Sequence, residues 1–205
     1  MSTKTTAANL WTFTAEDRAV ARTLAARLPE QLFDAHSHLY EQGHISPCHP
    51  LIQSGPATAG VEVWRRCLGQ QVGAARLKHV LCVPYPSRSG DPAAANRFVL
   101  NEVRRRKDLR ALVLAGPTTP RTEIESLLDD HPQVAGFKVY HLLAQQEDTF
   151  QCSPSEYIPD WVWQVADARG LLILLHLVRD AALADRVNQR YIRRYCQRYP
   201  RARLV

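Results

Sequence analysis

Several hallmarks of well-known protein classes are missing from this chain of 205 residues. The longest apolar stretch, Leu171–Leu175, is far too short to cross a membrane. Residues 1–14 hold no apolar core of signal-peptide length, and the five cysteines show no C-x-x-C spacing. We therefore expect reduced thiols, no membrane partner and a cytoplasmic location.

Acidic residues are few near the carboxyl end, where much of the net charge of +6 gathers. The arginines of this region are Arg186, Arg190, Arg193, Arg194, Arg198, Arg201 and Arg203. Such a patch could serve a basic nucleic-acid-binding α/β domain, which a salt-dependent binding assay would reveal. No Gly-rich or aromatic RNA-binding motif flanks these arginines, so we interpret them as a solvated helix face and expect no nucleic-acid partner.

Strands and helices are predicted to alternate along the chain. After a loose tail over residues 1–13, a capping box at Thr14 and Asp17 predicts a helix that ends near Leu28. Apolar runs predict strands over residues 31–36, 78–84, 109–115, 134–140, 171–176 and 203–205. Helical apolar stripes predict helices over residues 61–75, 92–103, 119–128, 159–169 and 180–195, with Asp91 and Asp180 as N-caps.

This alternation, with near-continuous apolar strands, predicts a parallel sheet covered by helices. Two architectures fit, a doubly wound open sheet and a (β/α)8 TIM-type barrel. The first strand-to-helix junction has neither G-x-G-x-x-G nor a phosphate-binding loop motif, so the doubly wound alternative lacks its signature. We predict a barrel-type α/β chain with about five β/α units and the start of a sixth strand, all parallel and side by side in chain order. Residues 1–30 would be the tail and first helix, and residues 31–205 a partial barrel.

The first predicted strand ends in a His-x-His pattern. Alternate residues of a strand share a face, so Asp34, His36 and His38 are expected to point the same way. Two imidazoles at this spacing can bind one divalent metal ion. The alternative is a pair of surface histidines at the end of a strand.

Two further strands are followed or closed by polar groups at the same predicted edge of the sheet. Lys138 and Tyr140 share a face at the end of the strand over 134–140, and His176 closes the strand over 171–176. Each has a structural alternative, a lysine reaching to the rim of the sheet and a histidine satisfied in the core. In barrels, however, the carboxyl ends of strands carry the chemistry.

The intervening loop over residues 39–60 holds three more metal-capable side chains, His44, Cys48 and His49. Their spacing matches no standard zinc pattern, so we predict no second metal site there. A loop of this length is expected to shape substrate specificity together with residues 141–155.

The combination of Asp34-Ala-His36-Ser-His38, Gly136-Phe-Lys138 and His176 resembles the amidohydrolase superfamily, in particular its amidohydrolase-related branch. The resemblance implies a (β/α)8 barrel and a divalent metal, zinc or alternatively manganese. It implies His36, His38 and His176 as metal ligands. It implies Lys138 as a further ligand or a substrate contact, since a lysine of this strand is carbamylated and bridges two metals in some branches.

The resemblance also implies a function, that of a metal-dependent hydrolase that cleaves an amide, lactone or related bond of a small-molecule substrate. A metal-dependent decarboxylase of the same family and a nonenzymatic barrel remnant acting as an interaction module are the alternatives. Family members carry a histidine on strand 6 and, on strand 8, the aspartate that acts as general base, and both positions would fall beyond Val205.

We therefore expect an amino-terminal portion of a barrel whose general base lies outside this chain. If the chain nevertheless proved active, Asp34 and His141 would be the first candidates for the base. The outer strands would expose unpaired edges, so either self-association or a complementing carboxyl-terminal segment is the expected partner.

Overall fold

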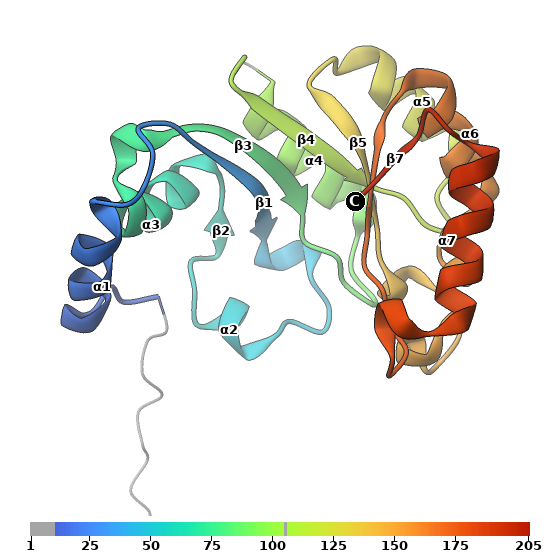
Figure 1. The fold of residues 1–205 in the computed structure, drawn as a ribbon, viewed down its shortest axis with the longest axis horizontal. Coiled ribbons are helices and arrows are strands. Elements are labelled where there is room, and N and C mark those ends of the chain that lie inside the picture. Colours follow the sequence, from blue (N-terminus) through green and yellow to red (C-terminus); the bar gives the residue numbers. More distant parts are fainter. Residues whose placement is uncertain (1–10, 105) are drawn as a thin grey trace, which may run out of the picture.

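The structure is a computed structural model that describes residues 11–104 and 106–205. The described strands form one seven-stranded sheet in the order β2-β1-β3-β4-β5-β6-β7 (Figure 1). The strands are β1 (Leu32–Glu41), β2 (Thr58–Ala59), β3 (Leu77–Pro84), β4 (Leu109–Leu114), β5 (Val134–Val139), β6 (Leu172–Leu175) and β7 (Arg203–Leu204). Among these, only the β1–β2 pairing is antiparallel.

Helices follow most of the strands and complete the α/β alternation. They are α1 (Ala15–Ala25), α2 (Pro50–Gln53), α3 (Val61–Val72), α4 (Pro92–Val103), α5 (Arg121–Asp130), α6 (Asp160–Arg169) and α7 (Arg186–Arg198). No described helix is long and apolar enough to span a bilayer.

The strand order confirms the predicted sequential arrangement of parallel strands. Right-handed crossovers between neighbouring parallel strands place all the connecting helices on one face of the sheet, unlike a doubly wound fold. In Figure 1, α3, α4, α5, α6 and α7 lie outside the curved sheet. The sheet is open over the described residues, so a closed barrel is not present. The expected bare edges are also partly covered, because β2 pairs with β1 and β7 pairs with β6.

The helix-covered face of the sheet holds the main core. Strand residues that are fully buried there include Val80, Cys82, Val113, Val139 and Ile173. Helix residues such as Val99, Ile124 and Trp163 pack against them, also without exposed surface. Burial of this apolar area is the principal driving force for the fold.

Strand β1 departs from the prediction in two ways. It runs to Glu41, five residues past the predicted end, because its last part pairs with β2 through Tyr40 and Ala59. The expectation that Asp34 shares a face with His36 and His38 is wrong. The pairing of β1 with β3 shifts register between Asp34 and Ser37, and the Asp34 carboxylate accepts a hydrogen bond from the Trp64 indole on the helix side, at 2.7 Å.

Gly136 allows β5 and β6 to approach closely at the site. Its φ of +156° is a conformation that residues with a side chain rarely adopt, and a Cβ there would lie 2.0 Å from the Leu172 carbonyl oxygen. The glycine of the Gly136-Phe-Lys138 motif is therefore explained by backbone packing. Lys138 lies two residues further along β5 and pairs in register with Leu174 of β6.

Helix termini follow the local signals with one exception. Thr14 and Asp17 form the predicted capping box, Asp91 caps α4, and Gly170 ends α6 in a left-handed conformation. The predicted N-cap Asp180 is wrong, because residues with positive φ precede α7 and Asp185 caps it instead. The predicted tail falls largely on residues 1–10, outside the described part of the chain.

Candidate functional site

The carboxyl ends of β1, β5 and β6 bring the predicted site residues to one edge of the sheet. His36 and His38 come from β1, Lys138 from β5, and His176 directly follows β6. Parallel strands in sequential order place these ends next to one another, although up to about 140 residues separate them along the chain. They are close enough that the charge of Lys138 contributes to lowering the pKa values of His38 and His176.

The two histidines of β1 face each other. Their Nε2 atoms lie 3.1 Å apart, and their ring centroids are separated by 4.8 Å. The other ring nitrogen of His38, Nδ1, lies 3.3 Å from the Pro84 carbonyl oxygen. A proton on Nδ1 would be donated to that carbonyl, which leaves the lone pair of Nε2 directed toward His36.

Lys138 is a lysine that is almost completely buried, with a relative exposure of 1%. Burial lowers the pKa of its ammonium group to about 8. The Nζ atom lies 5.3 Å from the centroid of the Tyr140 ring, within reach of a cation–π interaction. A buried lysine of this kind is costly for folding, and such groups are enriched at functional sites.

His176 belongs to a cluster of rings that includes Tyr140, the aromatic partner of Lys138. Its ring centroid lies 4.2 Å from that of Tyr140 and 5.4 Å from that of His141. The Tyr157 hydroxyl donates a hydrogen bond to the His176 carbonyl oxygen at 2.8 Å. His141 is itself buried, and its Nδ1 lies 2.9 Å from the Thr149 hydroxyl. The main chain of His176 and the ring of His141 are thus held by specific contacts.

All the histidines of the site are biased toward the neutral form. Burial, together with the charges of His36 and Lys138, lowers the pKa of His38 to about 4. Burial, together with the charges of Lys138, His141 and His36, lowers the pKa of His176 to about 4. Burial also lowers the pKa values of His36 and His141. Neutral imidazole is the form that binds a metal ion.

The predicted ligands are only partly assembled. His36 and His38 converge, whereas no group of three or more His, Cys, Asp or Glu side chains within the described ranges is arranged to hold a metal ion. The charge of His36 contributes to lowering the pKa of His176, but the three imidazoles do not meet at one point. The assignment of His36, His38, His176 and Lys138 as metal ligands therefore remains a prediction.

A cavity of about 600 Å³ opens beside His38. Residues 47–50 of the long loop line one side, residues 85–88 line the middle, and Tyr140 and Leu142 line the other side. Its walls are mostly apolar or aromatic, which suits a small organic molecule. Sequence reasoning anticipated the two outer walls, but it missed the 85–88 loop, whose Pro84-Tyr85-Pro86 run was the only local signal.

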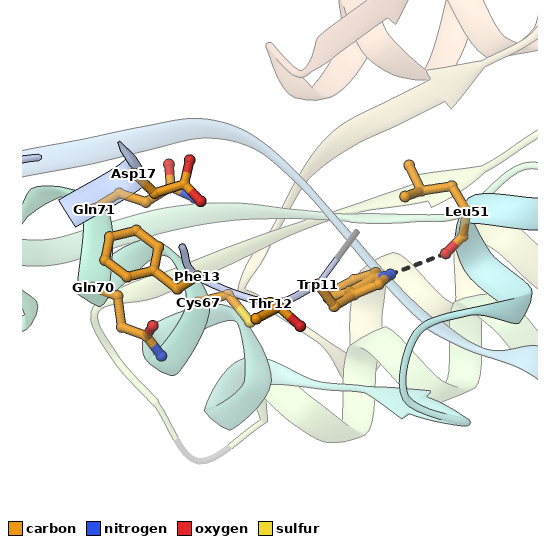
Figure 2. Close-up of a pocket in the computed structure, with 8 residues that line it drawn as sticks. All are labelled: Trp11, Thr12, Phe13, Asp17, Leu51, Cys67, Gln70 and Gln71. Carbon is orange, nitrogen blue, oxygen red and sulfur yellow. Dashed lines mark hydrogen bonds between the residues drawn. The ribbon is translucent and has the colours of Figure 1, made fainter. Parts of the chain in front are cut away.

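A second pocket, of about 330 Å³, lies where the amino-terminal segment crosses α2 and α3 (Figure 2). Trp11 Nε1 donates a hydrogen bond to the Leu51 carbonyl oxygen at 2.9 Å, as the dashed line shows. A Cβ at Gly55 would lie 2.5 Å from the Trp11 ring, so the indole rests directly on the backbone that follows α2. The pocket's single carboxylate, Asp17, is engaged in the capping box. This region therefore supports α2, whose first residue, Pro50, lines the larger cavity.

Comparison with protein-family models found no match, and neither did a search of curated proteins. Two solved structures are similar in part. A probable 2-pyrone-4,6-dicarboxylic acid hydrolase from Acinetobacter baumannii, solved with citric acid bound, is 19% identical over 70% of this chain and 48% of its own, with a TM-score of 0.46. A protein of Agrobacterium tumefaciens, solved in its apo form, is 23% identical over 72% of this chain and 48% of its own, with a TM-score of 0.47.

The chain thus spans about half the length of each of these two proteins. Similarity at this level of identity and structural overlap does not assign a function. The class that the structure itself defines is an α/β protein with an open, mostly parallel sheet and a histidine–lysine cluster at the carboxyl ends of its strands.

Proposed function

We propose that this chain provides the metal-binding half of a metal-dependent hydrolase of the amidohydrolase type. The observation that carries the proposal is the convergence of the His36 and His38 Nε2 atoms at 3.1 Å, beside the buried Lys138. The resemblance of the strand-end residues to that superfamily points to the same chemistry. The activity would cleave an amide, lactone or related bond of a small molecule bound in the adjacent cavity.

The two imidazoles fit a divalent ion. Nitrogen ligands about 2.0–2.1 Å from zinc in a tetrahedral arrangement lie roughly 3.3 Å apart, close to the observed separation. The Pro84 carbonyl beside His38 Nδ1 is the kind of second contact that holds a ligating histidine in the right tautomer. His176 would supply a third ligand, and zinc is the expected ion, with manganese as the alternative.

A bound divalent ion would supply acidified water and polarisation of the scissile carbonyl. The chain's own residues contribute binding and electrostatics. Lys138 is placed to contact the substrate or, as a neutral amine, to join the ligand set, because burial brings its pKa within reach of neutrality. Tyr140 and Tyr85 line the cavity and would contribute aromatic contacts to an apolar or planar substrate. The proposal places the general base outside residues 1–205.

One observation favours a second candidate, a nonenzymatic barrel remnant that acts as an interaction module. The described residues hold no complete three-ligand group, and a two-histidine site alone binds zinc weakly. Metal content separates the two candidates. A metal-dependent decarboxylase would use the same metal site, so only a substrate assay distinguishes it from a hydrolase.

The test measures zinc in the purified 205-residue chain by elemental analysis and by titration with zinc chloride. We expect about one zinc ion per chain, and its loss in the His36→Ala/His38→Ala double variant, because both converging ligands are removed. His79→Ala is the matched control, since His79 is an exposed histidine near the start of β3 and should leave zinc binding unchanged.

Equal zinc content in the double variant and the wild type would refute the metal assignment. Hydrolysis of lactones or amides and decarboxylation of aromatic carboxylates by this chain alone should both stay below ordinary turnover of about 1–10³ s⁻¹, because loss of a general base costs roughly 10²–10⁴ in rate. Full turnover would mean that the general base lies within the chain, and His141 would then be the candidate to test.

A further inference from the structure

The loop between β3 and α4 contacts both walls of the cavity beside His38. Residues 85–88 of this loop lie between the wall formed by residues 47–50 and the wall formed by Tyr140 and Leu142. Each outer wall belongs to a long connection with little regular structure, and such segments have low local stability unless something holds them. The loop makes separate hydrogen bonds to each of them.

The first connection runs through Ser87, which is buried with 8% relative exposure. Its hydroxyl accepts a hydrogen bond from the Ser46 backbone N–H and donates one to the Ser46 carbonyl oxygen, both at 2.7 Å. Ser89 N–H also donates to the Ser46 carbonyl, at 2.7 Å. A Cβ at Gly90 would lie 2.2 Å from the His44 carbonyl oxygen, so the two backbones touch. This connection holds the segment that leads into residues 47–50.

The second connection runs through Arg88. Its guanidinium donates to the Ala144 carbonyl oxygen at 3.2 Å and to the Gln146 carbonyl oxygen at 2.5 Å. These carbonyls follow the short helical turn His141–Leu143, which carries Leu142 into the cavity wall. Arginine presents two parallel donors in a rigid fork, so one side chain fixes two points of this wall.

We propose that Ser87 and Arg88 are positioning residues that determine the width of the cavity and thereby the size of the substrate it admits. The inference rests on the proposed function only in taking this cavity as the substrate site. Ser87 holds one wall and Arg88 the other, so the two residues act independently. Loss of one such hydrogen bond, whether neutral or to a charged group, is enough to shift the opening of a loop by about twofold to more than a hundredfold.

The first measurement is hydrogen–deuterium exchange on the intact chain. Ser87→Ala should speed exchange about fivefold or more in residues 44–48 and leave residues 141–151 unchanged. Arg88→Met should do the reverse, so each variant is the matched control for the other. Arg88→Lys keeps the charge without the fork and should restore only part of the protection. Residues 160–169 of α6 report general loosening and should not change in any variant.

The second measurement concerns size selection, which a merely stabilising role would not affect. Binding of benzoate and of 2-naphthoate to the zinc-supplemented chain is compared by calorimetry. Both probes carry one carboxylate, so loss of a charge contact cancels in the ratio of their affinities. We expect the naphthoate-to-benzoate ratio to rise about fivefold in Ser87→Ala and in Arg88→Met, because one wall is released in each.

Either an unchanged ratio or exchange that rises equally in both walls would overturn the proposal. Failure of the wild type to bind either acid would overturn it as well. None of these results depends on the zinc stoichiometry of the His36→Ala/His38→Ala variant. That measurement tests the proposed function separately.

Discussion

The two faces of the sheet differ in what packs against them. On the helix-covered face, Val113, Val139 and Ile173 have no exposed surface and contact side chains of several helices. On the opposite face, the buried cluster contains strand residues alone, and Leu172 and Leu174 at its margin remain partly exposed. The same strands therefore contribute to a large helix-covered core on one side and to a small cluster with partly exposed margins on the other.

The polar groups of the candidate site gather on the less covered side. Lys138 is in register with Leu174, while its neighbour Phe137 packs into the main core. Desolvation of a lysine and of neutral histidines opposes folding, so this cost has to be met by the apolar face behind them. Because successive residues of a strand point to opposite faces, one face of the sheet supplies most of the stability and the other carries the candidate site.

The largest expected effect comes from a pair of substitutions in β6 that face opposite ways. Ile173→Ala should lower the free energy of unfolding by about 2–5 kcal/mol, because it leaves a cavity in a fully packed core. Leu174→Ala removes a similar volume from a partly exposed position and should cost about 1 kcal/mol. Urea unfolding of both variants measures the contrast. Equal losses would show that the two faces are packed alike.

The next effect has the opposite sign. Lys138→Met should raise the free energy of unfolding at pH 7 by about 3 kcal/mol, because burial lowers the lysine pKa from 10.5 to about 8 and one unit corresponds to about 1.4 kcal/mol. In the wild type the unfolded chain binds more protons than the folded chain between these values, so its stability rises as the pH rises from 8 to 10.5. The advantage of the variant should therefore shrink at pH 10.

Urea unfolding at pH 7 and pH 10 tests this, with Lys78→Met as the matched control. Lys78 is an exposed lysine of β3, and its replacement should leave stability nearly unchanged at both pH values. A destabilised Lys138→Met variant would mean that the ammonium group has a compensating partner in solution.

The smallest effect concerns the histidines in protein freed of metal by a chelator. The pKa values of His38 and His176 are lowered from 6.5 to about 4, so the folded chain binds fewer protons than the unfolded chain between these values. Stability should be full above pH 6.5 and fall as the pH drops toward 4, by on the order of 1–2 kcal/mol in total once solvent screening of these partly exposed rings is allowed for.

The measurement is urea unfolding at pH 7 and pH 4.5 for the wild type and for a His38→Gln/His176→Gln variant. The variant should lose less stability on acidification, since glutamine does not titrate. Parallel pH profiles would place the two imidazoles in water rather than beside Lys138.

Much of the secondary structure followed from short-range signals in the sequence. The capping box of Thr14 and Asp17, the Asp91-Pro92 helix start and the Gly170 helix end involve hydrogen bonds between residues at most a few positions apart. Asp180 failed as a cap because an aspartate can cap any nearby turn, and the positive φ values of Arg179 and Ala182 delay the helix to Asp185. Local signals predict that a helix starts, with an error of a few residues.

The site followed from the sequence only in part. His36 and His38 are two residues apart in one strand, so their shared face could be derived from the strand period. The register shift that turns Asp34 toward Trp64 depends on pairing with β3, about 45 residues away, and no local pattern encodes it. The antiparallel strand β2 is too short to show a periodicity, and it was missed for the same reason.

The sequence by itself determined the alternation of elements, the parallel order of the strands and the residue types at their carboxyl ends, because periodicity and chain connectivity act along the chain. Only the tertiary structure decided which of these groups meet. Twist and register bring Lys138 and His176 close to the β1 histidines, yet leave the three imidazoles short of a common point. The hydrogen bonds of Ser87 and Arg88 to Ser46, Ala144 and Gln146 join segments about 40 to 60 residues apart, and such contacts exist only once the sheet has formed.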